Sequence, residues 1–166
     1  MKSKRVSVVA GILLSLVSVV PAGSAGAGEE RAPNRFMGVR VAAGGVISGD
    51  RIVYEGGDVV VVPEGAGDSF DSCPNGYVCL FEDVNWGGSL IQLSSCCAWN
   101  NLSAYGFDNL ASSWRNRKNV DAQIATGSGG GGSRLCLNNN SYSSSMPGGW
   151  DNVASSLRVR DASTYC

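Results

Sequence analysis

The sequence contains no histidine, and this absence excludes several classes of active site. Ser-His-Asp and Cys-His nucleophile pairs, His-Glu metalloprotease helices and histidine-ligated zinc all need that residue. We therefore expect no enzyme activity. Charge is also sparse and balanced, since charged residues make up 16% of the 166 residues and the net charge is −1. This balance lacks the basic excess of nucleic-acid-binding proteins, so no nucleic-acid partner is expected.

Long hydrophobic runs are missing after the first 20 residues. The apolar run over residues 6–20 follows three basic residues and precedes the small residues 25–27, Ala-Gly-Ala. It is shorter than the roughly 20 residues that span a bilayer, so the pattern predicts a cleaved secretory signal over residues 1–27. We expect the remaining chain to be secreted to the extracellular space as a monomer, without integral membrane association.

The cysteines all lie downstream of the predicted signal. They are Cys73, Cys79, Cys96, Cys97, Cys136 and Cys166. An even number of cysteines in an exported chain indicates up to three disulfides, and the lack of a C-x-x-C pair argues against a zinc-thiolate site. Cys73 and Cys79 enclose the turn sequence Pro-Asn-Gly, so we expect these two to be joined. The pairing of the other four stays open.

Helix signals are rare, because no segment keeps apolar residues at helical spacing over three turns. Short apolar runs separated by turn residues recur instead, at 46–47, 52–54, 59–62, 78–81, 90–93, 122–124 and 157–159. This pattern is typical of an all-β sandwich.

Two segments of the chain are interpreted separately. Residues 28–71 hold a weak hairpin and no cysteine, and we expect them to form an accessory arm or a pro-region. Residues 127–133 have the composition of a flexible linker.

An internal repeat is the most informative feature of the chain. Residues 108–115, DNLASSWR, recur as DNVASSLR at residues 151–158, with six of eight positions identical. A Cys-Leu pair precedes each copy, at residues 79–80 and 136–137. The repeat therefore predicts a duplicated supersecondary unit.

Each repeat carries oxygen donors that suit a hard cation. Asp108-Asn109 and Asp151-Asn152 supply a carboxylate and an amide, and Ser112-Ser113 and Ser155-Ser156 supply hydroxyls. Calcium takes about six to eight oxygen ligands, and affinity falls with fewer carboxylates, so we expect weak binding with a Kd of about 10⁻⁴ to 10⁻³ M. The open alternative is an Asx turn whose serines only satisfy backbone groups.

The start of the first unit adds the pattern Phe81-x4-Trp86-x-Gly88. Together with the acid/amide pair and the two serines, it resembles the βγ-crystallin Greek-key motif. The resemblance implies an all-β, βγ-crystallin-like Greek-key sandwich of two motifs, stapled by disulfides. The domain would cover residues 72–166, with a first motif over about 77–125 and a second over about 134–161.

The same resemblance assigns roles to the repeat. Ser112 and Ser155 would bind calcium together with the two acid/amide pairs. Ser113 and Ser156 would each lock a folded hairpin. Apart from the resemblance, we interpret Glu82-Asp83 as a solvated turn in which Glu82 lends a carbonyl to calcium. The second unit departs from the pattern, because the residues after Leu137 include one aromatic and no glycine in register.

A further resemblance covers residues 73–157. It is carried by CPNGYVCLFE at 73–82, WGG at 86–88, NLSAYGFDN at 101–109 and SSWRN at 112–116. These segments resemble small secreted actinobacterial proteins grouped as a peptidase inhibitor family, whose founding type inhibits thermolysin-type metalloproteinases. The resemblance implies that the chain blocks an extracellular protease through a rigid surface loop. The alternatives are a non-inhibitory, calcium-stabilised binding or envelope-stress protein, and a small antimicrobial toxin.

Overall fold

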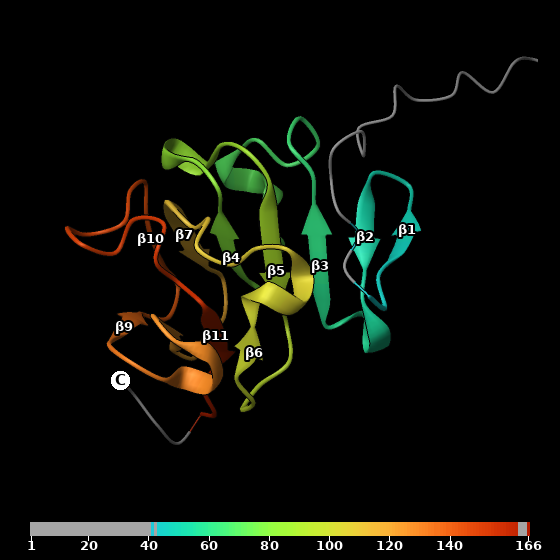
Figure 1. The fold of residues 1–166 in the computed structure, drawn as a ribbon. Coiled ribbons are helices and arrows are strands. Elements are labelled where there is room, and N and C mark those ends of the chain that lie inside the picture. Colours follow the sequence, from blue (N-terminus) through green and yellow to red (C-terminus); the bar gives the residue numbers. More distant parts are fainter. Residues whose placement is uncertain (1–40, 42, 163–165) are drawn as a thin grey trace, which may run out of the picture. The chain divides into compact units, whose positions relative to one another are not determined.

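A computed structural model describes residues 41, 43–162 and 166, which form two antiparallel β-sheets (Figure 1). The predicted signal over residues 1–27 lies outside the described residues. Sheet A has the strand order β1-β2-β3-β5-β4-β7-β10, and sheet B has the order β6-β11-β8-β9. The strands are β1 Val46–Ser48, β2 Arg51–Val53, β3 Val59–Val62, β4 Val78–Phe81, β5 Leu90–Leu93, β6 Asn100–Asn101, β7 Ser113–Asn116, β8 Ala122–Ala125, β9 Arg134–Leu137, β10 Ser141–Ser143 and β11 Ser156–Val159. The predicted all-β class is confirmed.

The helical residues in the described part of the chain are short 3-10 turns. They are η1 Glu55–Gly57, η2 Phe70–Ser72, η3 Val84–Trp86, η4 Leu102–Tyr105 and η5 Ser128–Gly130. Within the same residues there is no helix with the length and apolar character that crossing a bilayer requires.

The two sheets are built from two Greek keys that exchange their third strands. β4, β5 and β7 of the first key share sheet A with β10, and β8, β9 and β11 of the second key share sheet B with β6. The first key therefore covers residues 78–116, and the second covers residues 122–159. The sequence-based bounds instead put β8 in the first unit and start the second at about residue 134. The prediction of a flexible linker over 127–133 is wrong. This segment contains the 3-10 turn η5 and forms the hairpin connection between the paired strands β8 and β9 of one key.

The main core lies between the sheets, and a second, smaller core lies on the outer face of sheet A. Alternation along β4 divides its side chains, so that Val78 and Leu80 enter the main core while Cys79 and Phe81 enter the second one. Residues 63–73, named here the covering segment, lie over the second core. Ala66 and Cys73 of this segment pack there.

The segment predicted as an accessory arm, residues 28–71, contributes strands β1–β3 and most of the covering segment. β3 pairs with β5 over four residues, and all of Val59–Val62 are buried. Ile52 and Tyr54 join the main core. Residues 28–40 lie outside the described residues. The described part is thus integral to sheet A, and its role as a pro-region stays a prediction.

Candidate functional site

The acid/amide loops of the two keys meet each other across the domain. Ser112 Oγ donates to Asn152 Oδ1 at 3.3 Å, and Ser155 Oγ donates to Asn109 Oδ1 at 3.4 Å. The backbone N–H of each asparagine also donates to the carbonyl of the alanine before the opposite serine, at 2.9 and 3.0 Å. Each serine therefore faces the acid/amide loop of the other key.

The two asparagines owe this placement to a left-handed backbone. The φ angle is 57° at Asn109 and 54° at Asn152, a region that asparagine tolerates better than most residues. Their Nδ2 groups donate to Asp108 Oδ2 and Asp151 Oδ2 at 3.1 and 3.4 Å. The acid and amide side chains are exposed, whereas the serines are buried or half-buried. Each loop pair thus gathers only oxygen atoms as potential ligands.

Glu82 lies at the edge of one loop pair. It directly follows Phe81, whose carbonyl accepts the N–H of Ser112 at 2.8 Å. Its carboxylate Oε2 accepts the N–H of Ser89 at 3.4 Å within the same hairpin. The Glu82 carboxylate is therefore engaged in its own hairpin.

Each Greek key begins with a folded hairpin. Residues 82–89 connect β4 to β5, and residues 126–133 connect β8 to β9. Both hairpins contain one 3-10 turn with two neighbouring residues at positive φ. From the repeat, the second hairpin is expected after Leu137. The structure places it before β9 instead, in the glycine-rich segment 126–133. Glycine adopts positive φ without a steric penalty, which suits it to this turn.

A serine in the last strand of each key holds the corresponding hairpin. Ser113 Oγ donates to a hairpin carbonyl at 2.6 Å and accepts the N–H of Trp86 at 3.1 Å. Ser156 Oγ donates to Gly127 O at 2.6 Å and accepts the N–H of Gly130 at 3.0 Å. Ser113 and Ser156 are both completely buried. The two serines satisfy backbone groups that have no strand partner.

The six cysteines form three disulfides, which are Cys73–Cys79, Cys96–Cys97 and Cys136–Cys166. The first is the pair expected from the enclosed turn sequence, and both of its cysteines are fully buried. The second joins neighbours in the chain and is exposed. The third ties the C-terminal residue to β9.

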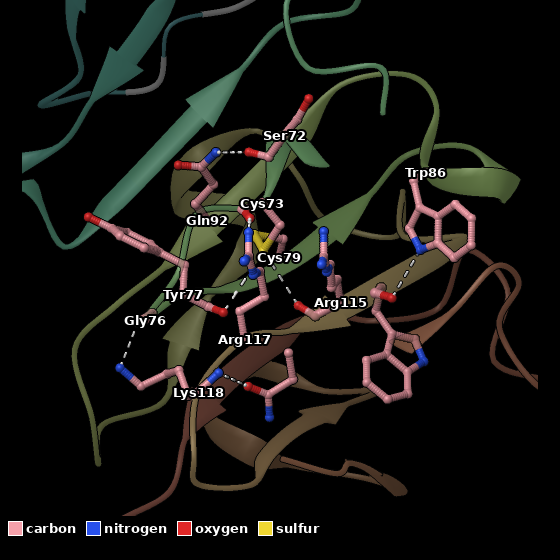
Figure 2. Close-up of a disulfide and its surroundings, with 12 residues drawn as sticks. Ser72, Cys73, Gly76, Tyr77, Cys79, Trp86, Gln92, Arg115, Arg117 and Lys118 are labelled. Atoms are coloured by element: carbon pink, nitrogen blue, oxygen red, sulfur yellow. Dashed lines mark hydrogen bonds between the residues drawn. A yellow bond between two sulfur atoms is a disulfide. The ribbon is translucent and has the colours of Figure 1, made fainter. Parts of the chain in front are cut away.

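Residues 73–79, named here the disulfide loop, are fixed by the segment after β7 (Figure 2). The carbonyl of Arg117 accepts the N–H of Gly76 at 3.0 Å, and its N–H donates to Tyr77 O at 2.8 Å. The Arg117 side chain adds a bond from Nη1 to Cys73 O at 2.8 Å. The disulfide loop is therefore held from the backbone and from a side chain.

Lys118 fastens the tip of the disulfide loop. Its Nζ donates to Gly76 O at 2.9 Å (Figure 2). The same Nζ also donates to Ser94 O at 2.7 Å. Partial burial lowers the pKa of the Lys118 ammonium, and the negative charge of Asp58 acts in the opposite direction. Asn75 and Gly76 remain exposed. The tip is thus accessible and still has a fixed backbone.

One further cluster contains potential metal ligands. Among the described residues, Asp121, Cys136 and Cys166 bring ligand atoms within 4.8 Å of one another. Both sulfur atoms are already joined in a disulfide, so they are not thiolate ligands. The Asp121 carboxylate accepts the N–H groups of Asn139 and Cys166, each at 2.9 Å. This cluster is structural.

The two interlocked Greek keys define a βγ-crystallin-type domain. The structure is similar to a βγ-crystallin domain solved to trace the evolution of this eye-lens fold, with a TM-score of 0.50 and 21% identity over 61% of this chain and 95% of that chain. A βγ-crystallin from Ciona intestinalis is 25% identical over 51% of this chain and 99% of its own, with a TM-score of 0.45. An archaeal βγ-crystallin is 23% identical over 52% and 99%, with a TM-score of 0.42.

Residues 66–137 match the model of peptidase inhibitor family I36. The match runs from the covering segment through the disulfide loop and the first key to the end of β9. No curated protein matches the sequence.

Proposed function

We propose that the protein is exported and inhibits an extracellular metallopeptidase through the disulfide loop. The match of residues 66–137 to a peptidase inhibitor family supports an inhibitor in place of a catalyst, and three disulfides suit an oxidising compartment. The observation that carries the proposal is the fixed loop, which is closed by a buried disulfide and tied down by Arg117 and Lys118. A preordered loop loses little conformational entropy on binding.

Inhibition is expected to depend on the loop tip. Residues 28–166, purified, should inhibit a thermolysin-type peptidase at micromolar concentration, measured by hydrolysis of a peptide substrate. Asn75→Arg should weaken inhibition by about tenfold, because a new charge at the contact surface must lose its hydration on binding. The melting temperature should stay unchanged, since Asn75 is exposed.

Ser103→Arg is the matched control, because it puts the same side chain on the exposed turn η4. This variant should inhibit like the parent protein. An absence of inhibition at micromolar excess would rule out the proposed activity. Equal losses in the two variants would show that the disulfide loop is not the contact surface.

We also propose that the crossed loop pairs bind calcium weakly. Each loop pair supplies a hydroxyl, an amide oxygen and a carboxylate. One pair consists of Ser112 and Asp151-Asn152, and the other consists of Ser155 and Asp108-Asn109. The Glu82 carbonyl is a further potential ligand at the first pair. This all-oxygen donor set fits calcium. The specific observation in favour is the hydrogen bonding of each serine to the other key's loop. A cation held there would tie the two keys together.

Calcium is expected to raise the melting temperature of the protein. With a Kd of about 10⁻⁴ to 10⁻³ M, about 10 mM calcium would add about 1.4 to 2.7 kcal/mol per site by mass action. Calorimetry with calcium, magnesium or a chelator measures this gain. The double variant Ser112→Ala, Ser155→Ala should lose it, and Ser145→Ala, at an exposed serine, should keep it. A melting temperature that does not change with calcium would contradict the proposed calcium site. An increase that persists in the double variant would contradict it as well.

A further inference from the structure

Arg115 and Arg158 occupy equivalent positions in the two keys. Each follows the first serine of its repeat by three residues and lies in the last strand of its key. In register, Arg115 stands opposite Cys79 of β4, and Arg158 stands opposite Gln123 of β8. Because Cys79 faces the second core outside sheet A, Arg115 lies on that outer face, and Arg158 lies on the corresponding face of sheet B.

The covering segment provides Arg115 with its partners. The guanidinium carbon lies 3.4 Å from the centroid of the Phe70 ring, and Nη1 donates to Phe70 O. Nη1 also forms an ion pair with Asp71 Oδ1 at 3.3 Å. Arg115 therefore has an aromatic surface, a carbonyl and a carboxylate, all supplied by its own chain.

Arg158 has the aromatic and the neutral oxygen but lacks the carboxylate. Its guanidinium carbon lies 4.7 Å from the centroid of the Trp99 ring, and Nε and Nη2 donate to Gln123 Oε1 at 3.1 and 2.8 Å. Among the described residues, the ion pairs involve Arg51 and Arg115, and Arg158 forms none. Gln123 is neutral, and the Asp161 carboxylate acts on Arg158 as a negative charge without forming an ion pair with it.

Two further arginines converge on the same contacts. Arg160 Nη1 donates to the same Gln123 oxygen at 2.9 Å, and the guanidinium carbon of Arg134 lies 5.4 Å from the Trp99 centroid. The pKa of Arg158 is lowered, first by burial and then by the charges of Arg160 and Arg134. We name Trp99, Gln123, Arg134, Arg158 and Arg160 the arginine site.

A cavity of about 150 Å³ adjoins the arginine site and is lined by Cys97 and residues 158–161. One water occupies about 30 Å³ of liquid, so the cavity has room for an ion of a few heavy atoms. Asp161 also lines the cavity and acts on Arg158 as a negative charge, so an incoming anion competes with this carboxylate.

We propose that the arginine site binds a single phosphate group, either free or attached to a larger molecule. Guanidinium groups present planar pairs of N–H donors that match phosphate oxygens. The bound phosphate would form an ion pair with Arg158, as the Asp71 carboxylate does with Arg115. A single group fits better than a long polyanion, because the net charge of the chain is −1 and the arginines form one compact cluster. Competition from Asp161 makes millimolar affinity the expectation.

Nuclear magnetic resonance of the arginine Nε–H and tryptophan Nε1–H signals tests this site directly. Residues 28–166 at neutral pH would be titrated with inorganic phosphate, with glycerol phosphate and with sodium chloride at matched ionic strength. The Arg158 and Trp99 signals should shift saturably with both phosphates and not with chloride. Tighter binding of inorganic phosphate would identify the free ion as the ligand, and tighter binding of glycerol phosphate would identify a phosphate carried by a larger molecule.

Variants separate recognition from general charge. Arg158→Gln should weaken phosphate binding by about tenfold, which is the loss of about one charge-assisted bond pair. Arg51→Gln removes the same charge from β2, where Arg51 is exposed and pairs with Asp50, and should leave binding unchanged. Arg158→Lys keeps the charge without the planar fork and should give an intermediate affinity.

Melting curves would show which variants remain folded, and Arg134→Gln replaces Arg158→Gln if the latter unfolds. Non-saturating shifts, equal shifts with chloride, or equal losses in Arg51→Gln and the arginine-site variant would overturn the proposal. Each of these results would leave the inhibition and calcium experiments unaffected, because the arginine site shares no residue with the disulfide loop or the crossed loop pairs.

Discussion

Gly130→Ala is expected to lower the free energy of unfolding by about 3 kcal/mol, whereas Gly129→Ala should lower it by about 1 kcal/mol. Both glycines have positive φ, 81° at Gly130 and 63° at Gly129, so alanine is strained at either position. They differ in their surroundings. A Cβ at Gly130 would lie 2.2 Å from Cε2 of Trp99, while a Cβ at Gly129 would meet nothing within 4 Å. The difference between the two variants therefore measures the packing of Trp99 on the hairpin.

Urea unfolding followed by circular dichroism gives both free energies. A flexible linker would accept either alanine with changes below about 0.5 kcal/mol, as exposed positions usually do. Equal small changes in the two variants would therefore contradict the folded hairpin at 126–133. The same variants bear on the arginine site, because the stacked position of Trp99 depends on the missing side chain at Gly130.

The strands that could be predicted from the sequence are those with consecutive apolar residues. Val59–Val62 and Val78–Phe81 are buried on both sides of sheet A, because the covering segment closes its outer face. A strand with two buried faces has no polar alternation and is easily recognised. β7 and β10 were not recognisable in this way, since Ser113–Asn116 and Ser141–Ser143 contain single aromatic residues among polar ones. Their pairing with β4 and with each other decides their structure.

The second hairpin shows why composition alone misled the prediction. Residues 126–133 are as rich in glycine and serine as a linker, but each glycine with positive φ serves a fixed turn. The evidence for order lies elsewhere in the chain, in the buried Ser156 and in Trp99. Neither residue is near the hairpin in sequence, so no local pattern reveals the contact.

The candidate sites also combine residues that the sequence singles out with contacts that only the fold reveals. The repeat was sufficient to single out Ser112 and Ser155, because the acid/amide loops are continuous in sequence. The crossing of each serine to the other key requires the exchange of β6 and β10 between the sheets. No local sequence pattern marks the whole arginine site, since it gathers Trp99, Gln123 and Arg158 from three separate segments. The equivalence of Arg115 and Arg158 within the repeat is the signal that could have located it.

Removal of strands β1–β3 is expected to have the largest effect on stability. Five buried aliphatic side chains, Ile52 and Val59–Val62, lie in this part of the chain. At about 1.5 kcal/mol each, they contribute about 7.5 kcal/mol, which is comparable with the whole stability of a small domain, about 5–15 kcal/mol. A chain that begins at residue 63 should therefore show little or no cooperative melting. It should also aggregate, because the loss of β3 exposes β5 as an apolar edge.

A chain that begins at residue 44 is the control, since it keeps all three strands and should melt like residues 28–166. Point variants give the same test without truncation. Val61→Ala, at a side chain that is 5% exposed, should cost about 2 kcal/mol, and Val46→Ala, at one that is 67% exposed, should cost almost nothing. If the chain from residue 63 melts within a few degrees of the control, β1–β3 are dispensable for the fold and the pro-region hypothesis gains support. If it fails to fold, proteolytic removal of these strands would destroy the disulfide loop that rests on the same sheet, so residues 44–62 belong to the mature domain.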